Sequence, residues 1–167
     1  MANQLLTSSF RLWIMLLQTR DTIWAVREKE VKKYGLSNIE VSVLFIISAI
    51  ELSLLKKATP IEISRWVFRK PSSITELLDR MQQRGLIIKN KEPNRKAVNV
   101  EITEKGRQIY HEITQSGTSI SRIMQTLNGE EQQQLWNHLS KLRGKALDEL
   151  ETKHKPPSPG FFYDPYS

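Results

Sequence analysis

Apolar residues recur at helical spacing along the first segment of the chain, from about residue 5 to residue 33. The repeating positions are Leu6, Phe10, Trp13, Leu17, Trp24 and Val31. Further apolar side chains between them make the stripe wider than one core face needs. A helix that is apolar on most sides must be covered on most sides, so the pattern predicts a long helix that takes part in a subunit interface. Gly35 follows it, and a glycine there is typical of a left-handed helix C-cap.

Three shorter helices are predicted next, each with a recognisable first residue. Ser37-Asn38-Ile39-Glu40 matches a capping box and opens a helix that extends to about residue 55. Thr59 and Pro60 supply an N-cap and a first-turn proline for a short helix to about residue 67. Pro71 opens a further helix, which stops at Gly85. The predicted core face of that helix consists of Ile74, Leu77, Leu78 and Met81.

The apolar pattern then changes its period. Residues 86–89 and 97–102 have the composition of two short strands, and the polar segment 90–96 between them contains Pro93, so we expect a hairpin with a basic tip. A long helix is predicted from Thr103 to about residue 127, and residues 128–131 break it and start another. Residues 153–167 hold four of the seven prolines, and we expect neither helix nor strand there.

The positive charge of the chain is concentrated in one stretch. The formal net charge is +7, and residues 56–107 contain 13 Lys or Arg against 6 Asp or Glu, which leaves 12 of each sign elsewhere. A localised basic patch is the electrostatic footprint of a protein that binds a polyanion. On charge alone, a solvated basic face that improves solubility is an equally good interpretation.

Several classes of protein are excluded by what the sequence lacks. There is no Cys, so no disulfide framework, thiolate zinc site or thiol switch is expected. The longest apolar run covers residues 12–17, far short of the roughly 20 residues of a membrane-spanning helix. The three histidines are scattered, and no nucleophile elbow, phosphate loop or dinucleotide fingerprint is present. We therefore expect a cytoplasmic protein that is not an enzyme and that has no cofactor, metal or membrane partner.

The two short helices and the basic hairpin together form a recognisable device. The second helix of such a pair fits the major groove of DNA and presents its N-terminal residues to base edges. Ser72, Ser73 and Thr75 lie at that end of the predicted helix 71–84, and Arg69 and Lys70 precede it. The hairpin would lie beside the duplex, with Arg95 or Lys96 reaching a minor groove. Taken singly, a serine pair at a helix start is more often a simple cap, and a basic hairpin tip is more often a solvated turn; the order and spacing of the elements together are far more specific.

Residues 59–106 resemble the winged-helix core of the multiple antibiotic resistance regulator (MarR) family. The matching segments, in the family order, are Thr59-Pro60-Ile61-Glu62-Ile63, Ser72-Ser73-Ile74-Thr75-Glu76-Leu77-Leu78-Asp79-Arg80-Met81, Arg84-Gly85-Leu86-Ile87 and Ile102-Thr103-Glu104-Lys105-Gly106. The flanking helices match as well, so the resemblance covers about residues 5–150. It implies a mainly α fold with a small β-hairpin, in which a winged helix-turn-helix core lies between long N- and C-terminal dimerisation helices.

The resemblance also implies a domain organisation and an assembly. Residues 1–36 would form the N-terminal dimerisation helix, 37–106 the DNA-binding domain, 107–152 the C-terminal dimerisation helices and 153–167 a Pro-rich aromatic tail. The expected homodimer interface comprises Leu6, Phe10, Trp13, Leu17, Ile123, Leu127, Leu135 and Leu139. Each subunit would place one recognition helix in a major groove, so a pseudopalindromic operator in double-stranded DNA is expected.

Members of this family commonly release DNA when a small anionic or aromatic molecule binds between the dimerisation helices and the DNA-binding lobe. The resemblance thus implies a regulator of transcription, in most cases a repressor, with an effector. Trp13, Trp24 and Trp66 are the candidate pocket residues, with ordinary core or interface packing as the alternative for each. The aromatic tail either lacks structure or docks against a groove or the partner subunit.

Two positions depart from the family pattern. The wing tip reads Asn94-Arg95-Lys96 where the family has Asp-Arg-Arg, which replaces a guanidinium fork by an ammonium and removes a carboxylate that could orient it. Glu76 occupies a recognition-helix position that is often basic, so it is either exposed, paired within the chain, or a reader of cytosine. These departures leave two alternatives open, a winged-helix protein-interaction module and a non-specific architectural DNA binder.

Overall fold

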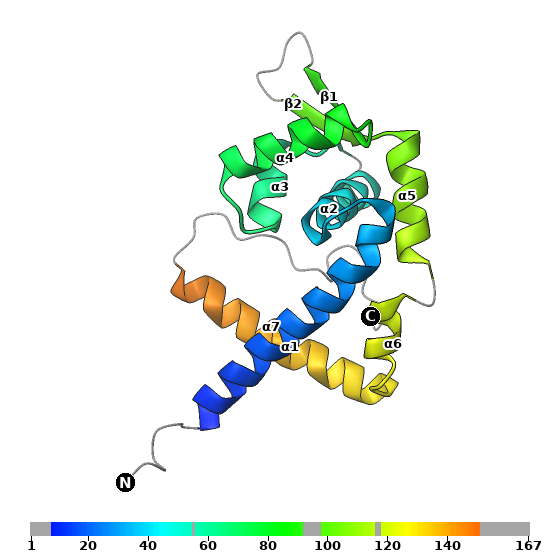
Figure 1. Cartoon of the computed structure of the whole chain (residues 1–167). Helices are drawn as coiled ribbons and strands as arrows, with labels where there is room; N and C mark the ends of the chain where they lie inside the picture. Colours follow the sequence, from blue (N-terminus) through cyan, green and yellow to red (C-terminus); the bar gives the residue numbers. More distant parts are fainter. Residues whose placement is uncertain (1–7, 55, 92–97, 116–117, 151–167) are drawn as a thin grey trace.

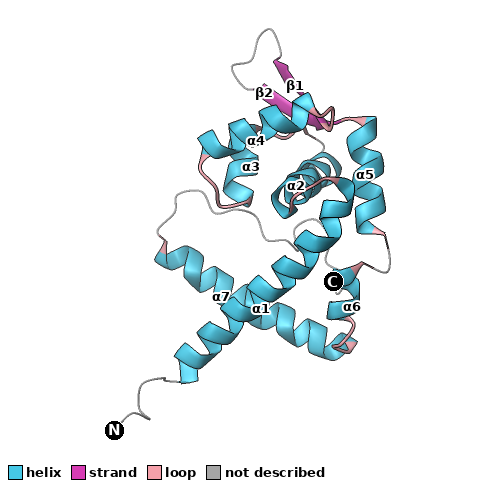
Figure 2. Ribbon diagram, viewed as in Figure 1, coloured by secondary structure: helices cyan, strands magenta, loops and turns pink. Residues whose placement is uncertain are grey.

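The computed structural model describes residues 8–54, 56–91, 98–115 and 118–150. Its elements, in chain order, are α1 (Ser8–Val31), the 3-10 turn η1 (Lys32–Tyr34), α2 (Asn38–Leu54), α3 (Pro60–Trp66), α4 (Pro71–Gln83), β1 (Ile87–Lys91), β2 (Val98–Ile102), α5 (Glu104–Thr114), α6 (Ser119–Met124) and α7 (Gly129–Glu149). Helices α2 to α5 and the hairpin form one lobe, from which α1 extends away (Figure 1). Helix α7 lies outside this lobe, at the level of the N-terminal half of α1 (Figure 2).

Helix α2 forms the centre of the lobe because its sequence is apolar on almost every side. Its residues Leu44, Ile47 and Ile50 are fully buried in the main core cluster. Helix α4 contributes the four apolar residues that its periodicity predicts, and all four are buried. Ile87 and Val100 of the hairpin and Ile113 of α5 complete the same cluster. The lobe therefore has a single core, against which the helix pair α3–α4 is held.

The predicted helix caps are present. Glu40 accepts a hydrogen bond from the backbone N–H of Ser37 (2.8 Å), and Thr59 and Glu62 form a reciprocal capping box at the start of α3. Gly35 and Gly85 have φ values of 66° and 69°, the left-handed conformation expected after a helix end. The helix boundaries in the lobe therefore depend on residues three or four positions apart, which explains why the sequence predicts them.

The two strands pair antiparallel, with Ile87 opposite Ile102 and Lys91 opposite Val98. On the other side of β2, the N–H of Val100 donates to the carbonyl of Ala58 at 2.8 Å, so the loop before α3 is tied to the hairpin. Lys89 of β1 forms an ion pair with Asp79 of α4. The hairpin is consequently fixed against both helices of the helix-turn-helix.

The structure differs from the sequence prediction after the hairpin. The single long helix expected from Thr103 to about residue 127 is two helices, α5 and α6. Thr118 has an extended backbone, and its side chain accepts a hydrogen bond from the N–H of Ser121, so a new helix begins there. A contact with α1 stabilises this break, because the Glu30 carboxylate accepts hydrogen bonds from the N–H and the hydroxyl of Ser119.

Some predicted features lie outside the described residues. They are Leu6, the wing tip with Asn94, Arg95 and Lys96, and the aromatic tail at 153–167. Within the described ranges, no single helix is long and apolar enough to cross a membrane; α1 with η1 and the first part of α2 satisfy the length and hydropathy test only together, with an 82° bend between them.

Candidate nucleic-acid interface and adjacent cavity

Helix α4 presents a polar face to solvent, opposite its buried core face. Ser72, Ser73, Thr75 and Glu76 are all exposed on it. The N-cap residue of α4 is Lys70, and no side chain caps the helix, so the serines do not serve as caps. The Thr75 hydroxyl donates within the helix to the carbonyl of Pro71 at 3.0 Å. Within the described part of the chain, the serine hydroxyls make no hydrogen bond and remain available to an outside partner.

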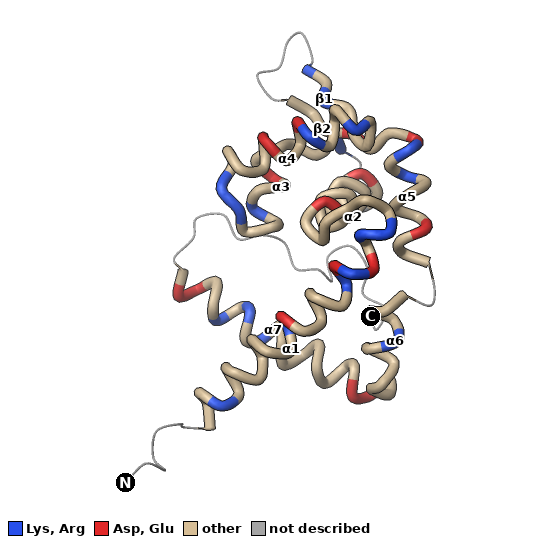
Figure 3. The backbone as a smooth tube through the Cα atoms, in the orientation of Figure 1, with Lys and Arg blue, Asp and Glu red and all other residues tan. Residues whose placement is uncertain are grey.

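The basic residues of the lobe gather around this helix. Figure 3 shows Lys and Arg in the turn between α3 and α4, on β1 and at the start of α5. Arg69 and Lys70 in the turn are exposed, and within the described ranges neither forms an ion pair. The turn before α4, with Arg69 and Lys70, thus forms a positively charged edge beside an uncharged serine pair.

A cavity of about 830 Å³ lies beside this edge, between α1, α2, the α3–α4 turn, α5 and α6. Its walls include the aromatic residues Trp24, Phe45, Trp66, Phe68 and Tyr110 and the cations Arg20, Arg27 and Arg69. Of the three tryptophans predicted for a pocket, the structure places Trp24 and Trp66 in its wall, whereas Trp13 does not line it. Arg69, predicted as a DNA contact, lies at the border of the cavity as well. Sequence reasoning missed the other lining residues because they come from distant segments without a common motif.

Phe68 has an unusual backbone. Its φ is 51°, and among the described residues it is the only one other than glycine with a positive φ. A bulky residue in the left-handed region costs about 1–3 kcal/mol, and such strain concentrates at functional positions. Phe68 belongs to the turn that leads directly into α4, and its ring is exposed at the cavity. The turn therefore joins the cavity wall directly to the start of α4.

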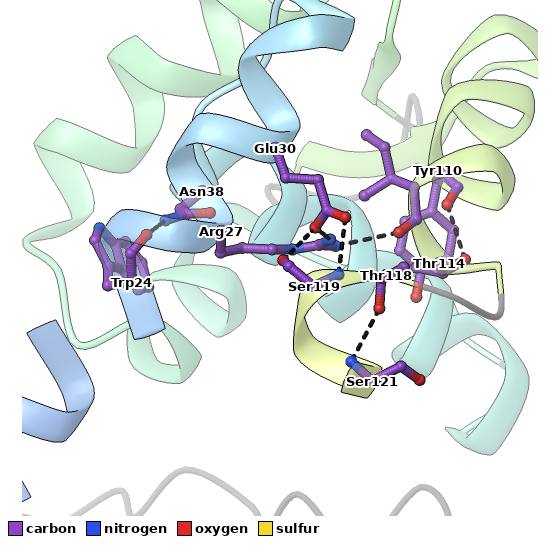
Figure 4. Close-up of polar contacts among 10 residues, drawn as sticks. Trp24, Arg27, Glu30, Asn38, Tyr110, Thr114, Thr118, Ser119 and Ser121 are labelled. Carbon is purple, nitrogen blue, oxygen red and sulfur yellow. Dashed lines mark hydrogen bonds and ion pairs between the residues drawn. The ribbon is translucent and has the colours of Figure 1, made fainter. Parts of the chain in front are cut away.

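Arg27 connects the cavity to the break between α5 and α6 (Figure 4). Its Nη1 donates to Glu30 at 2.6 Å, and its Nη2 donates to the carbonyl of Ile113, near the end of α5, at 3.3 Å. Glu30 in turn accepts from Ser119 N–H at 2.9 Å and from Ser119 Oγ at 2.6 Å. Helix α1 thus holds the end of α5 and the start of α6 through one ion pair.

The hydrogen bonds to Glu30 change its acidity. Partial burial by itself raises the pKa of the Glu30 carboxyl. The hydrogen bonds from Ser119 and the charge of Arg27 lower the pKa by a larger amount, so it falls from 4.5 to about 2. Tyr110 differs, because burial raises the pKa of its phenol above 10 despite the opposing charge of Arg27. At neutral pH the site therefore contains an ionised Glu30 and a protonated Tyr110.

Glu30→Gln is expected to lower the free energy of unfolding by about 2 kcal/mol at pH 7, because a charged acceptor strengthens each hydrogen bond from Ser119. Since the folded pKa of Glu30 lies below the unfolded value of 4.5, its contribution is complete above that pH and disappears as the pH falls toward 2. Thermal melts of wild type and variant from pH 7 to pH 2 measure this. Glu112→Gln, an exposed site on α5, is the control. A gap between the melting curves that stays constant with pH would contradict the assignment.

Asn38 borders the cavity with an unsatisfied acceptor. Its Nδ2 donates to the carbonyl of Trp24 at 2.8 Å, which defines the orientation of the amide, and its backbone N–H donates to Glu28 at 2.9 Å. Within the described residues, its buried Oδ1 has no hydrogen-bond partner. An unpaired buried acceptor costs about 1–3 kcal/mol. A molecule in the cavity that places a hydrogen-bond donor at this oxygen would therefore be favoured.

Helices α1 and α7 carry several large apolar side chains that are exposed in the described structure. Trp13 is 51% exposed and Phe10 47%, and Leu135 and Leu139 on α7 are exposed as well. Leu17, Ile123 and Leu127 are half-buried. Further apolar side chains of the same two helices are exposed beside the expected interface residues: Leu12, Met15, Leu16 and Leu142. An apolar surface of this extent typically marks an interface.

Comparisons with known proteins support the fold. No protein-family model matches the chain, and no curated protein sequence matches it. The chain is similar to the crystal structure of the organohalide-sensing transcriptional regulator RdhR with bound 2,4-dichlorophenol (25% identity, 95% of this chain and 93% of that chain, TM-score 0.78). It is also similar to a mutant MarR from E. coli in complex with operator DNA (19% identity, 84% and 99% coverage, TM-score 0.70). AbsC, a MarR family transcriptional regulator from Streptomyces coelicolor, superimposes with 17% identity, 87% and 99% coverage and a TM-score of 0.74.

Proposed function

We propose that this chain, which has the fold of the MarR-family transcriptional regulators, is itself a homodimeric, sequence-specific regulator of transcription that binds double-stranded DNA in the cytoplasm. The observation that carries the proposal is helix α4. Its core face is anchored in the lobe, whereas the hydroxyls of Ser72 and Ser73 are exposed and unpaired beside a basic edge. A helix of this kind fits the major groove, and small hydroxyls pair with bases and phosphates.

The contacts divide into two classes. Arg69 and Lys70 are assigned to backbone phosphates, because they lie in the turn before α4 and make no ion pair within the described residues. Ser72, Ser73 and Thr75 are assigned to base edges or phosphates at the N-terminal half of α4. Arg95 and Lys96 of the wing, which lie outside the described residues, are proposed to contact the adjacent minor groove.

The dimer is proposed to form through the uncovered apolar faces of α1 and α7, with residues 1–36 and 107–152 as dimerisation segments and 37–106 as the DNA-binding domain. Two copies related by a two-fold axis would present two α4 helices about one helical turn of DNA apart. The operator would therefore be pseudopalindromic. We propose that the protein is a repressor, as is more usual among regulators of the family that it resembles.

The cavity is the proposed effector site. Five aromatic side chains and three arginines suit a small aromatic molecule with an acidic group, and one similar protein contains bound 2,4-dichlorophenol. The cavity borders the strained turn at Phe68 and also Arg27, which holds α5 and α6. An anion that pairs with Arg27 would weaken these contacts and reorient α4 relative to the dimerisation helices.

A selection of duplexes from a random library at near-physiological salt tests the proposal. A palindromic motif is expected, and the logarithm of affinity for it should fall with log salt by about 0.9 per phosphate contact. Lys70→Ala should weaken all duplexes similarly and reduce that slope by about one. Lys141→Ala on α7 removes the same charge away from α4 and should leave the slope unchanged.

Binding without a motif, equally sensitive to salt for all sequences, would indicate an architectural DNA binder instead. No binding at low salt would indicate a protein-interaction module. The effector part of the proposal is tested by the same duplex with 2,4-dichlorophenol added as the probe, which should release the DNA and quench Trp24 and Trp66 fluorescence. Quenching without release would show an occupied cavity that does not control DNA binding.

A further inference from the structure

We infer that Glu76 is a specificity-determining residue that reads a cytosine in each half-site, an inference that rests on the proposed DNA-binding function. Glu76 lies in α4, one position from the buried Leu77 and two positions from Ile74 and Leu78. At 100° per residue, its side chain points almost directly away from that core face. The residue is exposed, so it stands on the part of the helix that would enter deepest into a major groove.

Among the residues that the structure describes, the carboxylate of Glu76 has no polar partner. Within the described ranges it forms neither an ion pair nor a hydrogen bond, although Arg80 follows four positions later. The other acidic residue on this helix, Asp79, is instead paired with Lys89 of the hairpin, which neutralises it and holds the hairpin to α4. Glu76 is therefore the one unneutralised negative charge on the described face of α4.

Its position determines which partner suits that charge. A carboxylate at the flank of the helix would lie near phosphates and be repelled, whereas one at the centre of the face lies over the floor of the groove. The flanks of α4 carry Ser73 and Thr75 instead, with Arg69 and Lys70 before the helix. The arrangement places neutral and positive groups toward the phosphate strands and the carboxylate toward the bases.

Base chemistry then selects cytosine. A carboxylate only accepts hydrogen bonds, and the major-groove edge of cytosine offers the N4 amino donor without an adjacent acceptor. Guanine presents two acceptors and thymine an acceptor with a methyl group, so both oppose the carboxylate. Adenine presents a donor, but its N7 acceptor lies beside it. Glu76 is thus expected to favour one C·G pair about tenfold over the alternatives.

The experiment is the selection of randomised duplexes with wild type, Glu76→Gln and Glu76→Ala. In wild type we expect one conserved cytosine in each half-site. Glu76→Gln should change that position toward adenine, since an amide both donates and accepts, and Glu76→Ala should relax it, with the remaining motif intact. Glu112→Gln, which removes the same charge from the exposed face of α5, should preserve the wild-type motif.

The outcomes separate this inference from the function on which it rests. If the wild type selects a motif and both Glu76 variants select the same motif, the inference is wrong and the regulator proposal stands. If Glu76→Ala binds every sequence more tightly by the same factor, the carboxylate lies near phosphates, and the inference that it reads cytosine is wrong. If the wild type selects no motif, the proposed function itself fails. A circular dichroism spectrum equal to that of wild type confirms that each variant is folded.

Discussion

Gly106→Ala is expected to destabilise the lobe by about 3 kcal/mol, a large share of the about 5–15 kcal/mol by which domains are usually stable. A Cβ atom at this position would lie 2.1 Å from the carbonyl oxygen of Leu86 and 2.9 Å from Cγ2 of Ile102. Backbone atoms cannot rotate away as a flexible side chain can, so α5 or the β1 strand must shift.

The close approach has a local cause. Thr103 caps α5 by accepting from the N–H of Gly106 at 3.0 Å, and its own N–H donates to Leu86 at 3.1 Å. The Thr103 hydroxyl also donates to the carbonyl of Gly85 at 2.6 Å. These bonds bring the first turn of α5 against the turn between α4 and β1. A shift that relieves the clash would stretch them, and the hairpin would lose its fixed position beside α4.

Urea denaturation followed by circular dichroism measures the effect, with Gly129→Ala as the matched control. Apart from its chain neighbours and the adjacent backbone of α7, no atom of the described residues lies within 4 Å of a Cβ at Gly129, so that variant should differ from wild type by less than about 1 kcal/mol. We also expect Gly106→Ala to bind the operator more weakly. Equal stability of the two alanine variants would show that α5 adapts without cost and would contradict the prediction.

Trp13→Glu is expected to convert the proposed homodimer to monomers. The indole of Trp13 is half exposed in the single chain, on the uncovered apolar face of α1, and a carboxylate buried there without a partner would cost several kcal/mol. Because each subunit then contacts only a half-site, operator affinity should fall by about a hundredfold or more.

Analytical ultracentrifugation and operator titration measure the two effects. Gln18→Glu is the control, since it introduces the same charge at an exposed polar position of α1 and should leave a dimer. A Trp13→Glu dimer with normal operator affinity would place Trp13 outside the interface. A monomer with unchanged affinity would instead show that dimerisation is not required for DNA binding.

Two short motifs that carried the family resemblance have a common structural explanation. Arg84-Gly85-Leu86-Ile87 and Ile102-Thr103-Glu104-Lys105-Gly106 are separate in the sequence but contact each other around the Leu86 carbonyl. Lys105 adds a hydrogen bond to the carbonyl of Arg84 at 2.9 Å, and Arg84 pairs with Glu40 at 2.6 Å. The motifs therefore specify one junction between α4, the hairpin and α5.

The proposed site was only partly accessible from the sequence. The exposed serines of α4 and the basic turn were predicted, because helical periodicity alone decides which side of α4 is polar. The family resemblance implies Trp24 and Trp66 as pocket residues, whereas no pattern in the sequence marks Phe45, Phe68 or Tyr110. The domain boundaries and the individual contact residues stay predictions.

The sequence by itself determined the local elements, because caps, turns and helical faces depend on residues within about four positions of one another. Thr59 with Glu62 begins α3, and the glycines at 35 and 85 end helices, wherever the rest of the chain lies. Only the tertiary structure decided the contact of Glu30 with Ser119 that stabilises the break at Thr118, the approach of Gly106 to Leu86, and the cavity. Each of these depends on atoms from segments far apart in the chain, such as Glu30 and Ser119, whose meeting follows from the packing of the lobe and not from any local pattern.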